Sequence, residues 1–232
     1  MKRFPYLTGR ILEKNEKMKG KKFNTINSGV SGNNSMHSIN LLLNKSLRRK
    51  PKIAVLMHNI NDLSSLLYMK SYWGENKYRS LLVDDKSKEL NLLAIPLKIG
   101  QAFPQISSRI NSILPLKDEF DNIRGKRINY DKEKIINLFT KSLLSFIELS
   151  KIWGVEPVLM TQMNRLDSQP NKMINDWFKV TGDDIKISYS EYRSLFLDFN
   201  KVIRETAKKE NILLIDLANE IPKTSKYIYD VV

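Results

Sequence analysis

The chain has 232 residues, 41% of them hydrophobic, no cysteine and a formal net charge of +14. This length and apolar fraction suit one compact domain with a sizeable core. The lack of cysteine excludes a disulfide framework, a thiolate metal site and a cysteine nucleophile. No apolar run reaches the roughly 18 residues of a membrane-spanning helix, and no signal-peptide core follows Met1. We therefore expect a soluble protein, whose compartment the sequence leaves undetermined.

The positive charge is the strongest compositional feature, and it could attract a polyanion such as nucleic acid. The basic residues, however, are spread along the chain and are dense only at 14–22 and 45–52. No recognisable nucleic-acid motif organises them. We therefore interpret most of them as a solvated surface and expect no specific nucleic-acid partner.

Hydrophobic periodicity indicates the elements of the first half. Residues 5–19 suit a short surface helix packed by one face, and 22–30 read as a short strand that stops at Gly29. A polar loop reaching Ser35 leads to a second helix, which ends in basic residues before Pro51. The apolar run 52–58 predicts a buried parallel strand. Residues 64–130 lack sustained periodicity, and we interpret them as an insertion or cap.

The second half repeats the alternation. Asp131 is a candidate cap for a long amphipathic helix that Gly154 ends, and 155–161 form the next predicted strand. A polar segment leads to a helix over about 189–210, and a last strand ends at Asp216. Short apolar runs alternating with helices predict an α/β fold, a mainly parallel sheet covered on both faces in three layers. Because ligands in such folds bind at strand carboxyl ends, the residues following the strands are the candidate site.

Three segments resemble the blocks of the SGNH/GDSL-type hydrolases. They are Asn27-Ser-Gly-Val-Ser-Gly-Asn-Asn-Ser, then Asn59-Ile-Asn-Asp-Leu, and then Val158-Leu-Met-Thr-Gln, with Asp230 near the end of the chain. Their order and spacing fit that family. The resemblance implies a flavodoxin-like α/β/α domain over 1–232 that hydrolyses carboxylic esters with a serine nucleophile and no cofactor. It covers residues 5–62 and 131–232.

The resemblance assigns roles to three residues. Gly32 would supply a backbone N–H and Asn61 a side-chain amide to the oxyanion of the attacked ester, while Asp230 would orient the catalytic histidine. Asn33, His58, Asn59 and Thr161 are pocket candidates. Two histidines without a spaced carboxylate cluster give no persuasive metal site.

Both ends of the chain depart from the family pattern. No Gly-Asp-Ser precedes Gly32, the first strand is not found, and the histidine three places after Asp230 would be residue 233. We therefore expect an incomplete copy of an esterase, of a type that acts on acetylated saccharides or lipids. The alternative is a noncatalytic binding protein that retains the ligand pocket of that fold.

Each candidate also has an ordinary structural interpretation. Gly32 suits a turn, and Asn61 and Asp62 suit a helix start, where we expect Asp62 to cap free N–H groups. His58 reads first as a packing residue at a strand end, and only secondarily as a pocket residue or base. Ser31 or Ser35 could replace the missing nucleophile, although no Gly-x-Ser-x-Gly turn supports either.

Overall fold

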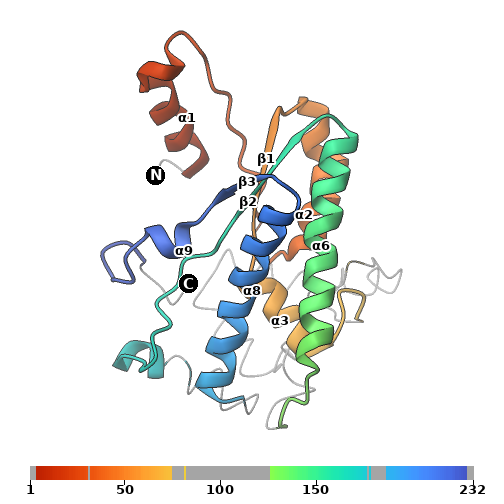
Figure 1. The fold of residues 1–232 in the computed structure, drawn as a ribbon, viewed down its shortest axis with the longest axis vertical. Coiled ribbons are helices and arrows are strands. Elements are labelled where there is room, and N and C mark those ends of the chain that lie inside the picture. The colour runs from red at the N-terminus through yellow and green to blue at the C-terminus, as the bar shows by residue number, and fades with distance from the viewer. Residues whose placement is uncertain are drawn as a thin grey trace, which may run out of the picture.

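A computed structural model describes residues 4–30, 32–74, 81, 126–176, 178 and 187–228. This part of the chain folds into a parallel three-stranded sheet flanked by helices, a mixed α/β arrangement (Figure 1). The strands are β1 (Ile53–Met57), β2 (Glu156–Met160) and β3 (Leu213–Ile215), in the order β1-β2-β3. Because the strands are parallel, the residues that follow Met57, Met160 and Ile215 meet at one edge of the sheet.

The longer helices match the predicted ones. Asp131 caps α6 as expected, since its Oδ1 accepts a hydrogen bond from the backbone N–H of Lys134 at 3.0 Å. Ser188 and Glu191 form a reciprocal capping box at the start of α8. The helices are α1 (Phe4–Lys14), α2 (Ser35–Leu41), α3 (Ile60–Met69), α6 (Lys132–Ile152), α8 (Tyr189–Lys209) and α9 (Leu217–Glu220).

The main core lies between the sheet and the two long helices. Both α6 and α8 pack on β2, and α8 also packs on β3. Phe139 of α6 stacks on Phe199 of α8 with ring centroids 4.2 Å apart, and both rings are fully buried. Leu56 and Leu159 bring the inward face of β1 and β2 into the same cluster. The helices α2 and α3 close this core at the side of α6.

The other face of β1 is exposed among the described residues. Ile53, Val55 and Met57 alternate with the inward residues and are 55%, 48% and 41% exposed. Their parallel partners on β2 share this face, and of these Val158 and Met160 are buried. The described structure thus shows an α/β sheet with its helical layer on one face. The predicted three-layer arrangement needs helices on both faces, and the described residues do not establish it.

The prediction of a strand within residues 22–30 is wrong. Residues 21–30 contain no strand, and two of them, Phe23 and Thr25, contact α1. The backbone N–H of Phe23 donates to the Glu13 side chain of α1 at 3.2 Å, and Thr25 packs against Gly9. A short run of strand-forming residues needs a ladder partner, and here one of its backbone N–H groups bonds to a helix instead.

The predicted insertion at 64–130 overlaps the described residues only at its two ends. Residues 64–69 continue α3 into the core, and Tyr72 just beyond them is fully buried. Apart from Leu81, residues 75–125 lie outside the part that the structure describes. Among the described helices, none combines the length and apolar character needed to cross a membrane.

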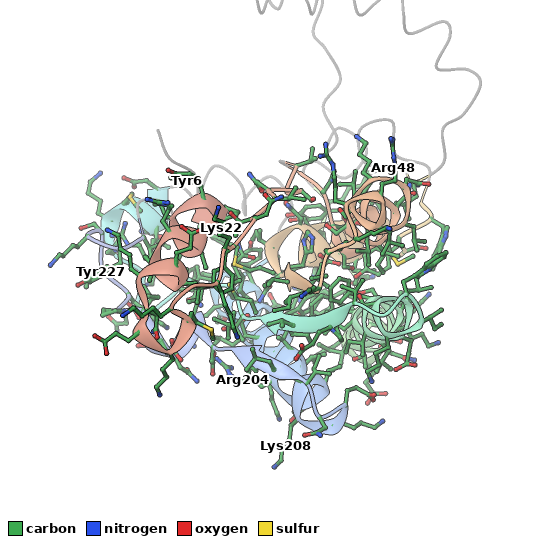
Figure 2. The ribbon with its side chains drawn as sticks, turned by 90° about the horizontal axis from the view of Figure 1, so that it is seen from above. Tyr6, Lys22, Arg48, Arg204, Lys208 and Tyr227 are labelled. Carbon is green, nitrogen blue, oxygen red and sulfur yellow. The ribbon has the colours of Figure 1, made fainter. Side chains whose placement is uncertain are left out.

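The basic side chains of the described surface do not all gather on one element. Lys22 lies on the segment after α1, Arg48 just beyond α2 and Lys208 near the end of α8, and the three labels stand well apart in the view (Figure 2).

Candidate functional site

The Gly32 loop and the start of α3 meet at the carboxyl end of β1. The side-chain amide of Asn61 donates to the carbonyl oxygen of Asn33 at 2.9 Å. Gly32 has a φ of +81°, a left-handed conformation that favours glycine, and the space around it would admit a Cβ. Its glycine is therefore required by the turn and not by close packing. Gly32, Asn33 and Asn61 are all half-buried.

The loop is also fixed at the start of α2. Asn34 is the N-cap residue, and its Oδ1 accepts from the backbone N–H of His37 at 3.1 Å. The amide of Asn34 donates across to Ser65 Oγ of α3 at 3.2 Å. His37 completes the capping box through its ring, since its Nδ1 accepts from the backbone N–H of Asn34 at 3.3 Å. His37 is therefore engaged in holding the loop.

A fully buried carboxylate, Asp62, lies behind this loop. Both of its oxygens accept from the backbone N–H of Ser35, at 3.1 and 3.0 Å, and the Ser35 hydroxyl also donates to it. The Tyr72 hydroxyl donates to Oδ1 at 2.6 Å. The expectation that Asp62 caps its own helix is therefore wrong, because it caps the first N–H of α2 instead. Its charge is stabilised by hydrogen bonds that tie α2 to α3.

Tyr72 and Ser142 complete this buried cluster. Burial raises the pKa of Tyr72 well above its ordinary value, and the neighbouring Asp62 charge raises it further. The phenol therefore stays protonated and remains a donor to Asp62. Ser142 of α6 lies with its Oγ 2.8 Å from Ser35 Oγ and donates to the Phe139 carbonyl at 2.7 Å. The cluster joins α2, α3 and α6 by polar contacts.

His58 connects the buried carboxylate to the surface. Its Nδ1 lies 3.5 Å from Asp62 Oδ2, and its Nε2 lies 2.7 Å from the hydroxyl oxygen of Ser38. Burial lowers the pKa of His58, and the Asp62 charge opposes that effect. The imidazole is therefore neutral near pH 7, and we assign its proton to Nδ1, facing the carboxylate. Nε2 then accepts a hydrogen bond from Ser38.

Asn59 and Thr161, two of the pocket candidates, are fully buried. The Asn59 amide donates to the Phe196 carbonyl at 2.9 Å and to Asn200 Oδ1 at 3.1 Å, so it attaches α8 to the end of β1. Asn59 Oδ1 is buried, and no bond to it is found among the described atoms. Asn59 thus lies in the interface with α8, below the surface of the site.

Thr161 belongs to a hydrogen-bonded group that joins the ends of β2 and β3. We call this group, formed by Thr161, Arg204 and Asp216, the latch. Its hydroxyl donates to Asp216 Oδ1 at 2.8 Å and accepts from the Ala218 N–H at 3.0 Å. Arg204 of α8 binds both oxygens of Asp216 at 2.8 Å. The hydrogen bond from Arg204 is the main reason that the pKa of Asp216 is lowered. These bonds give Thr161 a structural role at the carboxyl edge.

Asp230 and Ser31 lie outside the described residues, so their predicted roles stay predictions. Ser35 is fully buried and donates to Asp62, which removes it from contact with a substrate. The described residues contain no group of three or more side chains suited to hold a metal ion.

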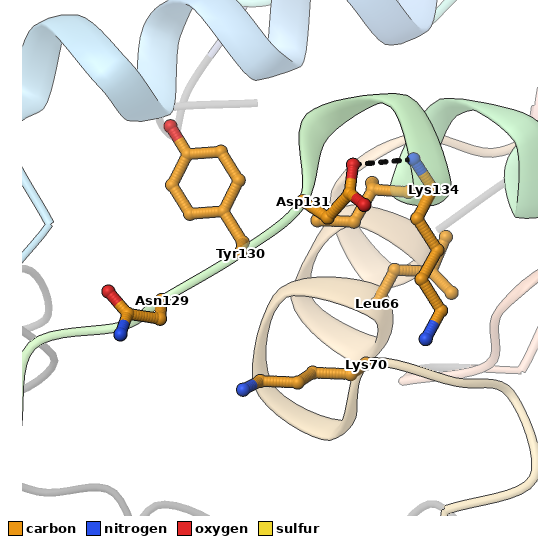
Figure 3. Close-up of a pocket in the computed structure, with 7 residues that line it drawn as sticks. Leu66, Lys70, Asn129, Tyr130, Asp131 and Lys134 are labelled. Atoms are coloured by element: carbon orange, nitrogen blue, oxygen red, sulfur yellow. Dashed lines mark hydrogen bonds between the residues drawn. The ribbon is translucent and has the colours of Figure 1, made fainter.

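A hollow of about 370 Å³ lies elsewhere, between the end of α3 and the start of α6 (Figure 3). Among its lining residues are Lys70, Tyr130, Lys134 and Asp131, which caps α6. Lys70 is about 14 Å further along α3 than Asn61, at 1.5 Å per residue. This hollow is therefore separate from the polar residues at the carboxyl end of β1.

Sequence reasoning missed the connection from Ser38 to Asp62. The hydroxyl residues of the cluster are far apart in the sequence, and serine has no periodic signal that marks burial. The spacing of His58 and Asp62, four residues apart across a strand end, was the one available clue.

Comparisons of the chain with family models, with curated proteins and with solved structures gave no match.

Proposed function

We propose that the chain is an ester hydrolase domain of the SGNH type, which cleaves carboxylic esters of acylated saccharides or lipids through a serine acyl-enzyme. The observation that carries the proposal is the contact between Asn61 and the Gly32 loop at the carboxyl end of β1. These are the two segments from which the family resemblance draws its oxyanion donors. They lie where open parallel sheets bind their ligands.

The Asn61 amide suits an oxyanion donor. An amide carries two N–H groups, and in the described part of the chain the carbonyl of Asn33 takes one of them. The other is available to an ester carbonyl oxygen, on which negative charge develops as the serine attacks. The hydrogen bond to Asn33 also fixes the orientation of the amide before the substrate arrives.

The edge of β1 supports the proposed three-layer, flavodoxin-like fold. β1 pairs with β2 on one side, and no described residue pairs with its other edge. Parallel sheets are normally covered on both faces, yet Val55 and Met57 are exposed here. A further strand at this edge and a second helical layer would complete the doubly wound arrangement.

The test is hydrolysis of p-nitrophenyl acetate by this chain and by a version extended through the flanking coding sequence. In the active form, Asn61→Ala should lower kcat by about 10²–10³, the usual effect of removing an oxyanion donor. Asn44→Ala, which removes an exposed amide beyond α2, is the matched control and should leave kcat unchanged. A loss under tenfold for Asn61→Ala would exclude the donor role. Folded but inactive forms would favour the noncatalytic binding protein.

A further inference from the structure

Three side chains at the carboxyl end of β1 stand in the order of a hydroxyl, an imidazole and a carboxylate. Ser38 Oγ lies 2.7 Å from His58 Nε2, and His58 Nδ1 lies 3.5 Å from Asp62 Oδ2. We propose that Ser38 is a nucleophile of this chain, activated by His58 as general base and oriented by Asp62. This relay is distinct from the family pattern, which uses a Gly-Asp-Ser serine and a histidine after Asp230.

The bond of Ser38 differs from those of three helical hydroxyls among the described residues. Thr140, Ser145 and Ser65 each donate to the carbonyl four residues back, at 2.8 Å. That is the ordinary partner of a serine or threonine within a helix. Ser38 of α2 instead meets an imidazole nitrogen from the end of β1. Ser38 is also half-buried and not enclosed in the core.

Asp62 is held firmly enough to orient the imidazole. Ser35 and Tyr72 bind its oxygens from α2 and from the turn after α3, and the carboxylate is fully buried. The 3.5 Å separation from His58 is long for a hydrogen bond. Contacts of this kind are often loose before a substrate binds. Because burial lowers the pKa of His58, Nε2 stays unprotonated near pH 7 and can take a proton.

The chemistry balances with these three groups and water. Ser38 Oγ attacks the ester carbonyl carbon as its proton passes to His58 Nε2. The tetrahedral intermediate then expels the alcohol, which takes that proton, and leaves an acyl group on Ser38. Water then attacks the acyl carbon and gives a proton to His58 Nε2. The bond between that carbon and Ser38 Oγ breaks, Ser38 Oγ takes the proton back from His58, and the acid is released. The choice of an ester as substrate rests on the proposed function, whereas the reactivity of Ser38 does not.

The experiment is covalent labelling of the full chain with a fluorophosphonate probe, followed by peptide mapping. The Ser38–phosphorus bond forms as fluoride leaves, and the hydroxyl proton passes through His58 to solvent. We expect one label per chain, on Ser38, and none in Ser38→Ala. His58→Gln should slow labelling by about 10² or more, the usual contribution of a general base. Ser145→Ala, which changes a half-buried helical serine bonded to a backbone carbonyl, should not alter the rate.

Peptide mapping of the labelled chain without substitutions identifies the labelled residue even if a variant fails to fold. Labelling at another residue, no labelling, or an equal rate in folded His58→Gln would overturn the proposal. Labelling of Ser38 without turnover of p-nitrophenyl acetate in either form would support the relay and contradict the proposed hydrolase. Turnover that depends on Asn61 but leaves Ser38 unlabelled would support the hydrolase and contradict the relay.

Discussion

Replacing Tyr72 with phenylalanine tests whether Asp62 is an ionised, buried carboxylate. The substitution removes the hydroxyl that donates to Asp62 Oδ1 at 2.6 Å and keeps the ring in the core. Both residues are at most 1% exposed, so water cannot replace the lost donor without rearrangement. Hydrogen bonds to charged groups contribute about 1.5–3 kcal/mol each. We expect Tyr72→Phe to lower the free energy of unfolding by about 2 kcal/mol, near the lower middle of that range, because Ser35 still binds the carboxylate.

Tyr189→Phe is the matched control, since it removes the same atom from a neutral bond near the surface. The Tyr189 hydroxyl donates to the backbone carbonyl of Asp167 at 2.8 Å, and Asp167 is exposed. Neutral hydrogen bonds contribute about 0.5–1.5 kcal/mol, and solvent can replace this one. We therefore expect a loss of about 0.5 kcal/mol, at the low end of the range.

Urea denaturation measures both variants. The free energy of unfolding is obtained from the shift in the transition midpoint, provided that the slope m stays constant. If Tyr72→Phe costs no more than Tyr189→Phe, then Asp62 is not a buried charge stabilised by this hydroxyl. In that case the account of the cluster, and of the orientation of His58, would fail.

Two further predictions concern the latch and the loop. The pKa of Asp216 is lowered in the folded chain, so its contribution to stability is present above the unfolded value near 3.8 and is lost as the pH falls through the folded value. Urea denaturation from pH 6 to pH 3 should show this loss, and Asp216→Asn should show a shallower one. Gly32→Ala should cost about 1–2 kcal/mol in urea denaturation, because φ is +81° there, whereas Gly32→Asn should cost less. Equal costs for the two substitutions at Gly32 would show that the loop adjusts its backbone.

The sequence predicted most of the regular elements because their patterns are long or bounded. α6 and α8 each extend over 21 residues with one apolar face, which fixes them independently of their neighbours. β1, β2 and β3 are short, but turns and helices bound them on both sides. The segment 22–30 has neither advantage. Two of its residues contact Glu13 and Gly9 of α1 and pair with no strand. Strand pairing depends on residues far away in the sequence, which a local pattern does not reveal.

The site could be predicted only as far as the chain order of its segments. The order of the family blocks predicted that Gly32 and Asn61 would lie near one another, and the structure brings Asn61 to Asn33, the residue beside Gly32. The role of Asp62 could not be read in the same way. Its partners Ser35 and Tyr72 come from separate elements, and an aspartate early in a helix ordinarily caps that same helix.

Asp62 takes part both in the stability of the buried cluster and in the proposed reactivity of Ser38. Its neighbours Tyr72 and Ser38 allow the two effects to be measured separately. Tyr72 faces the buried side of the carboxylate, so its removal weakens the junction of α2 and α3 before it affects the imidazole. Ser38 lies on the other side of His58, to which it bonds through Nε2, and not beside the carboxylate, so its removal leaves the buried cluster intact. If the hydroxyl at Ser38 served packing alone, Ser38→Ala and Tyr72→Phe would both act on unfolding. If the relay is chemical, Ser38→Ala abolishes labelling while the free energy of unfolding changes little.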